Sequence, residues 1–91
     1  MIIMSVDLGL ARTGIALCDA LQTLAFPKTV IHEHNTTRLV DKISQLAKEY
    51  GAKRIIVGLS ADNEAAKHLY EKHGFTVFEE DEEELLMEKE C

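Results

Sequence analysis

Short apolar runs separated by polar turns predict three strands in the first third of the chain. The first run is Ile2 to Asp7, followed by Leu8-Gly9, and the second is Thr13 to Cys18, so a hairpin is expected between them. Phe26 to His32 predicts a third strand. Pro27 near its start favours an edge position, because proline has no N–H to donate to a neighbouring strand.

The apolar spacing becomes helical after residue 35. Asn35 or Thr36 is a plausible N-cap, and Gly51 supplies a left-handed stop. Between them, apolar residues recur at Leu39, Ile43, Leu46 and Tyr50. Arg54 to Leu59 follows as an apolar run without alternation, which predicts a central parallel strand buried on both faces.

The last third of the chain predicts one helix and two strands. Asp62 is expected to cap a helix that runs to about His73. Thr76 to Glu80 and Glu84 to Lys89 predict two strands joined by an acidic turn. The expected order is βββαβαββ, an α/β fold in which a mixed six-stranded sheet carries two helices.

The composition is typical of one soluble globular domain spanning residues 1–91, with 46% hydrophobic and 29% charged residues. The apolar runs are far shorter than the ~18 residues of a membrane-spanning helix, so we expect no membrane partner. The N-terminus shows no secretory signal pattern, and a cytoplasmic location is expected. Cys18 and Cys91 have neither disulfide-framework nor metal-ligand spacing, which predicts two free thiols.

Charge is distributed unevenly along the chain. Residues 1–60 carry seven Lys or Arg and five Asp or Glu, a net charge of +2, whereas residues 61–91 carry three and eleven, a net charge of −8. Nucleic acid is therefore not expected as a partner of the acidic third. The acidic run from Glu79 to Glu84 is interpreted as a solvated turn, the alternative being a metal site or a site for a basic partner.

Several motifs in the first sixty residues occur together in one known family. They are Ser5-Val6-Asp7-Leu8-Gly9, Arg12-Thr13-Gly14-Ile15-Ala16, Asp19, Ala25-Phe26-Pro27, and Lys53-Arg54-Ile55-Ile56-Val57-Gly58-Leu59. With these motifs, residues 1–59 resemble the YqgF (RuvX) family of Holliday-junction resolvases, which have an RNase H-like fold.

The resemblance implies that Asp7 is the leading metal-binding catalytic carboxylate. Phosphodiester hydrolysis with two metal ions needs several carboxylates, and the family's other acidic ligands are missing after Leu59. Asp19, Glu33 or the Glu79 to Glu84 run would supply a second ligand only by chance. No cofactor is therefore expected to be required, and Asp7 is expected to bind Mg²⁺ or Mn²⁺ weakly or to be a leftover carboxylate at a strand end.

From about Ser60 onward, the chain resembles the C-terminal part of the GNAT N-acetyltransferases. The residues concerned are Asp62-Asn63-Glu64-Ala65-Ala66, Leu69-Tyr70-Glu71-Lys72-His73-Gly74-Phe75 and Leu85-Leu86-Met87-Glu88-Lys89. The resemblance implies that Asn63 and Tyr70 lie beside acetyl-CoA, with Tyr70 as the acid for the leaving thiolate. The loop that would hold the CoA pyrophosphate is absent. The alternatives are that Tyr70 covers the sheet and that Asn63 satisfies N–H groups at the start of a helix.

Two resemblances that meet near residue 60 lead to the hypothesis of a recombined or engineered chimera, with segments 1–59 and 60–91 and no complete active site. A residual metal-dependent nuclease or nucleic-acid binder and a residual acetyl-CoA binder are the alternatives. The resemblances also imply the strand order 3-2-1-4-6-5. Apolar surface left exposed by the new combination makes a homodimer a further expectation.

Overall fold

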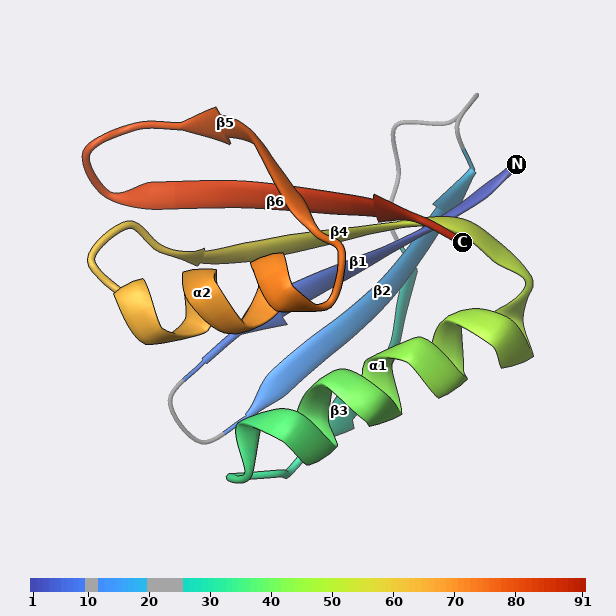
Figure 1. Ribbon diagram of the computed structural model, residues 1–91. Coiled ribbons are helices and arrows are strands. Elements are labelled where there is room, and N and C mark those ends of the chain that lie inside the picture. The colour runs from blue at the N-terminus through green and yellow to red at the C-terminus, as the bar shows by residue number, and fades with distance from the viewer. Residues whose placement is uncertain (10–11, 20–25) are drawn as a thin grey trace.

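The computed structural model describes residues 1–9, 12–19 and 26–91, with the elements in the order predicted from the sequence. Within these residues the chain forms six strands and two helices, whose arrangement is drawn in Figure 1. The elements are β1 (Ile2–Leu8), β2 (Thr13–Asp19), β3 (Phe26–Ile31), α1 (Thr36–Tyr50), β4 (Ala52–Ser60), α2 (Glu64–Lys72), β5 (Thr76–Glu80) and β6 (Glu84–Glu90).

All six strands form one mixed sheet in the order β3-β2-β1-β4-β6-β5, which confirms the predicted order. β1 pairs antiparallel with β2 and parallel with β4, and β6 pairs antiparallel with both β4 and β5. β3 lies at one edge of the sheet, as Pro27 indicated. The final hairpin thus doubles back, so that the last strand lies inside the sheet and β5 forms the other edge.

Both helices cover the same face of the sheet (Figure 1), and the hydrophobic core lies between them and the strands. The helices contribute Leu39, Val40, Ile43, Ala47, Ala66 and Tyr70, and the strands contribute mainly Met4, Val6, Ile15, Ile55, Val57, Leu59, Leu85 and Met87. These strand residues alternate along β1, β4 and β6, as expected when one face of a sheet is buried.

The opposite face of the sheet has no helix over it among the described residues, and the prediction that β4 is buried on both faces is wrong. Ile55 and Val57 are buried, whereas Ile56 and Gly58, which alternate with them along the strand, are partly exposed. β4 is therefore buried on one face only, although its apolar sequence does not alternate. We call this surface, which carries Ser5, Asp7, Gly14, Ala16, Ile56, Gly58, Glu84 and Leu86, the open face.

The helix ends follow from local capping, with one correction. Asn35 caps α1 by accepting from the Arg38 N–H, and Gly51 ends that helix at φ +69°. α2 is capped by Asn63, whereas the carboxylate of Asp62, the predicted cap, accepts a hydrogen bond from the Ser60 hydroxyl. Among the described residues, no helix has the length and apolarity needed to cross a membrane.

Candidate functional site

Asp7 lies near the end of β1, where the chain turns towards β2, and its side chain is exposed on the open face. The residues beside it on the neighbouring strands are both glycines, Gly14 on β2 and Gly58 on β4. A Cβ atom added to Gly14 would lie 4.0 Å from Asp7 Cβ. The carboxylate is thus flanked by bare backbone on both sides, which leaves room for a ligand to approach it.

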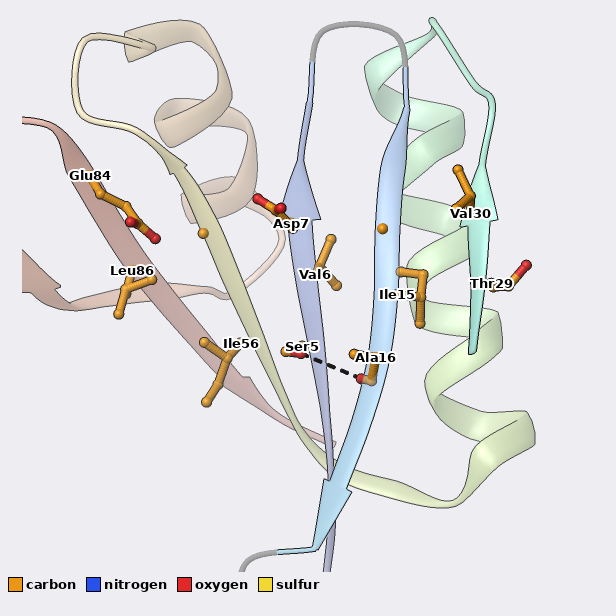
Figure 2. Close-up of a pocket in the computed structure, with 12 residues that line it drawn as sticks. Ser5, Val6, Asp7, Ile15, Ala16, Thr29, Val30, Ile56, Glu84 and Leu86 are labelled. Carbon is orange, nitrogen blue, oxygen red and sulfur yellow. Dashed lines mark hydrogen bonds between the residues drawn. The ribbon is translucent and has the colours of Figure 1, made fainter. Parts of the chain in front are cut away.

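The open face is hollowed around this aspartate, with a volume of about 550 Å³. Figure 2 looks onto the hollow with the helices behind the sheet, and shows the Asp7 and Glu84 side chains turned towards each other across β4. Ser5 lies two residues before Asp7 on the same face of β1, and its hydroxyl donates to the Ala16 carbonyl at 3.5 Å. A second, smaller hollow at the strand ends is also lined by Asp7, Gly58 and Glu84.

Glu84 reaches Gly58 from the far side of β4. It begins β6 and pairs with Ser60, two residues beyond Gly58. A Cβ atom added to Gly58 would lie 3.0 Å from Glu84 Oε1 and 3.4 Å from Leu86 Cδ2. The Glu84 carboxylate therefore occupies space that a side chain at position 58 would need.

The other acidic residues considered as second ligands lie elsewhere. Asp19 pairs with Ile2 at the opposite end of the β1–β2 ladder from Asp7, and its side chain is outside the described part of the structure. Glu33 forms an ion pair with Lys42 at 3.1 Å, and this contact lowers the pKa of Glu33. Within residues 1–9, 12–19 and 26–91, no group of three or more His, Cys, Asp or Glu side chains is placed to hold a metal ion.

The acidic run has a structural role in the turn between β5 and β6. The Asp81 carboxylate accepts from the N–H groups of Glu84, at 2.7 Å, and Glu83, at 2.8 Å, which lowers the pKa of Asp81. Asp81 N–H in turn donates to the Glu84 carbonyl at 2.9 Å. This tight turn sets the start of β6 and hence the position of Glu84. The alternatives of a metal site or a basic partner for the whole run remain predictions.

Three basic residues of the family motifs, Arg12, Lys53 and Arg54, could bind phosphate only weakly, and they do not form one patch. Arg12 is exposed at the β1–β2 turn, where its carbonyl accepts from Gly9 N–H at 2.9 Å, close to the end of β1 that carries Asp7. Lys53 and Arg54 lie near the start of β4, at the other end of the sheet, and Arg54 forms an ion pair with Glu88. Of these three residues, Arg12 is the one that lies at the same end of the strands as Asp7.

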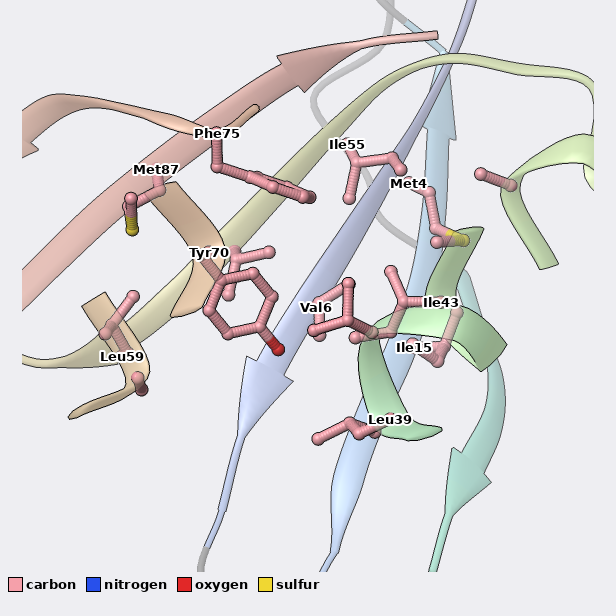
Figure 3. Close-up of a cluster of buried hydrophobic side chains, with 14 of the residues drawn as sticks. Met4, Val6, Ile15, Leu39, Ile43, Ile55, Leu59, Tyr70, Phe75 and Met87 are labelled. Carbon is pink, nitrogen blue, oxygen red and sulfur yellow. The ribbon is translucent and has the colours of Figure 1, made fainter. Parts of the chain in front are cut away.

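Tyr70 lies on the helix-covered side of the sheet, away from Asp7. Its side chain is completely buried, and its ring makes an edge-to-face contact with Phe75 at 5.2 Å between centroids. Figure 3 shows the ring packed in the core, and its hydroxyl has no hydrogen-bond partner among the described residues. Burial raises the pKa of Tyr70 to about 12. The structure thus encloses the Tyr70 side chain in the core. Its role as the acid for a leaving thiolate stays a prediction.

Asn63 sits at the start of α2, where its side-chain oxygen accepts from Ala66 N–H at 3.1 Å. It also lines a hollow between the two helix N-termini, together with Thr36, Thr37, Ala65, Ala66 and Leu69. The capping alternative considered for Asn63 is therefore present in the structure. Its predicted contact with acetyl-CoA stays a prediction.

Comparison with known proteins relates most of the chain to one family. Residues 1–83 match the family model described as RuvX: Holliday junction resolvase. A protein of Chloroflexus aurantiacus, named "Putative pre-16S rRNA nuclease", is 40% identical over 58 residues, covering 64% of this chain and 38% of that protein. A protein of the same name from Thermosynechococcus vestitus is 32% identical over 80 residues, covering 79% of this chain and 53% of its own length.

The chain thus spans only about two fifths to one half of the length of these curated relatives. No solved structure matches it. The predicted break at residue 59 conflicts with the family match, which continues through α2 and β5 to residue 83. The hypothesis of a chimera without catalytic function is therefore wrong, and nothing in these matches supports the acetyltransferase resemblance of residues 60–91.

The structure explains why the segment after residue 60 misled the sequence interpretation. Asn63 is a helix cap and Tyr70 a core residue, and any short helix packed on a sheet needs a cap and a buried face. Such residues indicate a helix packed on a sheet, but they do not identify the protein family to which it belongs. The unbroken match over residues 1–83 does identify it: this chain belongs to the RuvX family of Holliday junction resolvases.

Proposed function

We propose that this chain is a divalent-metal-dependent nuclease whose reaction takes place at Asp7 on the open face of the sheet. The observation that carries the proposal is the placement of Asp7 within the family match: its carboxylate is exposed, lies in a hollow of about 550 Å³ and has a glycine on each side. Bare backbone on both neighbouring strands would let a phosphodiester approach the carboxylate closely.

The residues around Asp7 fit a hard divalent cation. Mg²⁺ prefers oxygen ligands and is commonly held by one or two carboxylates, with waters and substrate phosphate oxygens completing its coordination. A bound cation would polarise the phosphoryl oxygen and lower the pKa of a bound water. The chain's own contribution is to hold the Asp7 carboxylate at a fixed strand position, through its pairing with both β2 and β4.

This proposal makes nucleic acid a partner, contrary to the expectation drawn from charge. The net charge of −6 predicts weak binding that depends strongly on salt, because few phosphates would be neutralised. Arg12 is exposed at the same end of the strands as Asp7, and it is therefore the basic residue placed to contact a phosphate there. The family and relative names indicate two substrates to compare: a branched DNA junction and a precursor of 16S rRNA.

A cleavage assay at low salt with Mg²⁺ or Mn²⁺ tests the proposal on both substrates. We expect Asp7→Asn to lower the cleavage rate by about 100-fold or more, since the amide keeps the shape but loses the charge that attracts the cation. Asp62→Asn is the matched control, because this exposed carboxylate lies outside both hollows lined by Asp7. Equal cleavage by wild type and Asp7→Asn, or no cleavage of either substrate by folded protein, would reject the proposal.

A further inference from the structure

Two carboxylates from distant parts of the chain meet on the open face. Asp7 comes from β1 and Glu84 from β6, and β4 runs between these strands in the sheet. Both side chains line the same two hollows with Gly58 of β4, and Figure 2 shows them turned towards each other. The arrangement depends on β6 lying inside the sheet next to β4.

Gly58 provides the space in which the two carboxylates approach. Neighbouring strands lie about 4.8 Å apart, so Asp7 Cβ lies about that far from the point where a Cβ of Gly58 would be. Glu84 Oε1 lies 3.0 Å from that same point. A cation with metal–oxygen distances of about 2.0 to 2.6 Å could therefore contact both carboxylates above Gly58 after small side-chain rotations.

Neither carboxylate is neutralised within the described part of the chain. The ion pairs there involve Glu33, Glu64 and Glu88, and none reaches Asp7 or Glu84. Two carboxylates that face each other without a cation repel, and a divalent ion placed between them removes this repulsion. The paired geometry thus favours binding of a cation more than either carboxylate would alone.

The register of β6 selects Glu84 from the acidic run. Leu85 and Met87 point into the core, so Glu84 and Leu86 face the open side. Asp81 is engaged by the backbone of the turn, and Glu82 lines neither hollow that contains Asp7. Glu83 lines the smaller hollow with Asp7 and Gly58, whereas Glu84 is the member of the acidic run that lines both hollows.

We propose that Glu84 is the second protein ligand of the divalent cation held by Asp7, and that the absence of a side chain at Gly58 keeps the space between the ligands open. The proposal rests on the proposed function for the identity of the cation. It adds a ligand from β6 that lies beyond the family match, which ends at residue 83.

Mn²⁺ titration followed by electron paramagnetic resonance tests this inference without reference to catalysis, because free Mn²⁺ loses its sharp signal when it binds. We expect one ion per wild-type chain. Glu84→Gln should raise the Kd for Mn²⁺ about tenfold or more, which corresponds to about 1.4 kcal/mol, and Asp7→Asn should raise it further. Glu82→Gln, which removes the same charge from the same turn, should leave the Kd within about twofold because its effect is screened by solvent.

Circular dichroism of each variant checks that weaker Mn²⁺ binding does not result from unfolding. A Glu84→Gln protein that binds Mn²⁺ as tightly as wild type, while Asp7→Asn does not, overturns the inference and leaves the proposed nuclease intact. Equal weakening by Glu84→Gln and Glu82→Gln also overturns it, because general charge would then explain the effect. Wild-type binding that depends on Glu84, without cleavage of either substrate, supports the inference and rejects the proposed nuclease.

Discussion

The two faces of the sheet are built from the same strands but differ in burial and in charge. Along β4, Ile55 and Val57 are almost completely buried beneath the helices, at 2% and 0% exposure, while Ile56 and Gly58 face the open side. The covered face is apolar apart from a few atoms such as the Tyr70 hydroxyl. The open face mixes apolar residues with Asp7 and Glu84. Stability is thus concentrated on one side of a strand, which leaves charged groups free on the other.

Ile55 and Ile56 offer the sharpest test of this contrast, because they are the same residue type at adjacent positions of β4. Ile55→Ala should lower the free energy of unfolding by about 2 to 5 kcal/mol, since it leaves a cavity in the core. Ile56→Ala should cost about 1 kcal/mol or less. Urea unfolding of both variants measures the difference.

Equal losses from Ile55→Ala and Ile56→Ala would contradict the contrast and show that the open face is covered in solution. A second copy of the chain is one possible cover, as the predicted homodimer would require. Val30, 48% exposed at the edge of this face, adds to the apolar surface available for such a contact. Repeating the unfolding at several protein concentrations would reveal the dimer, because its stability depends on concentration.

Tyr70 tests how the covered face tolerates a polar group. Its pKa is raised to about 12 from the ordinary value of 10.0, so the folded protein holds the proton at a pH where the unfolded chain releases it. The associated stability is fully present below pH 10 and is lost as the pH rises to about 12. The loss should reach about 2 to 3 kcal/mol, at about 1.4 kcal/mol per pKa unit.

Tyr70→Phe should remove this alkaline loss. At neutral pH it should also raise the free energy of unfolding by about 1 kcal/mol, because the buried hydroxyl has no partner among the described residues. Urea unfolding of both proteins between pH 7 and 12 measures the two effects. Parallel pH profiles for wild type and variant would show that the hydroxyl is hydrated or hydrogen-bonded in solution.

The smallest expected effect concerns the start of α2, which holds Tyr70 over the sheet. Asn63→Ala should cost about 1 kcal/mol, because the N–H of Ala66 loses its acceptor. Asp62→Ala should cost a few tenths of a kcal/mol, since its exposed carboxylate bonds only to the Ser60 hydroxyl within the described region. Thermal unfolding compares the two, and a larger loss from Asp62→Ala would return the cap to the residue first predicted.

Local signals were sufficient for the elements of this fold and for one candidate site residue. Gly51 ends α1 as predicted, and every expected strand is present within one or two residues of its predicted bounds. Asp7 was found through its motif. Asp62 and Asn63 both had side chains suited to the start of α2, and only the backbone geometry decided that Asn63, and not Asp62, is the cap.

Glu84 could not be singled out in the same way. It was one of six consecutive acidic residues, and its proposed role depends on which strand β6 pairs with and in which register. The one-sided burial of β4 was missed for a similar reason. Ile56 is as apolar as Ile55, so the difference between them comes from where the helices pack.

The sequence by itself determined where strands and helices form and where acidic charge accumulates, and its motif singled out Asp7 as the candidate for the leading carboxylate, because these follow from local periodicity, capping and motif. The tertiary structure decided that both helices cover one face, that Tyr70 is enclosed, and that Glu84 lines the same hollows as Asp7 and Gly58. These outcomes join residues up to 77 positions apart in the chain, and such contacts depend on strand order and register.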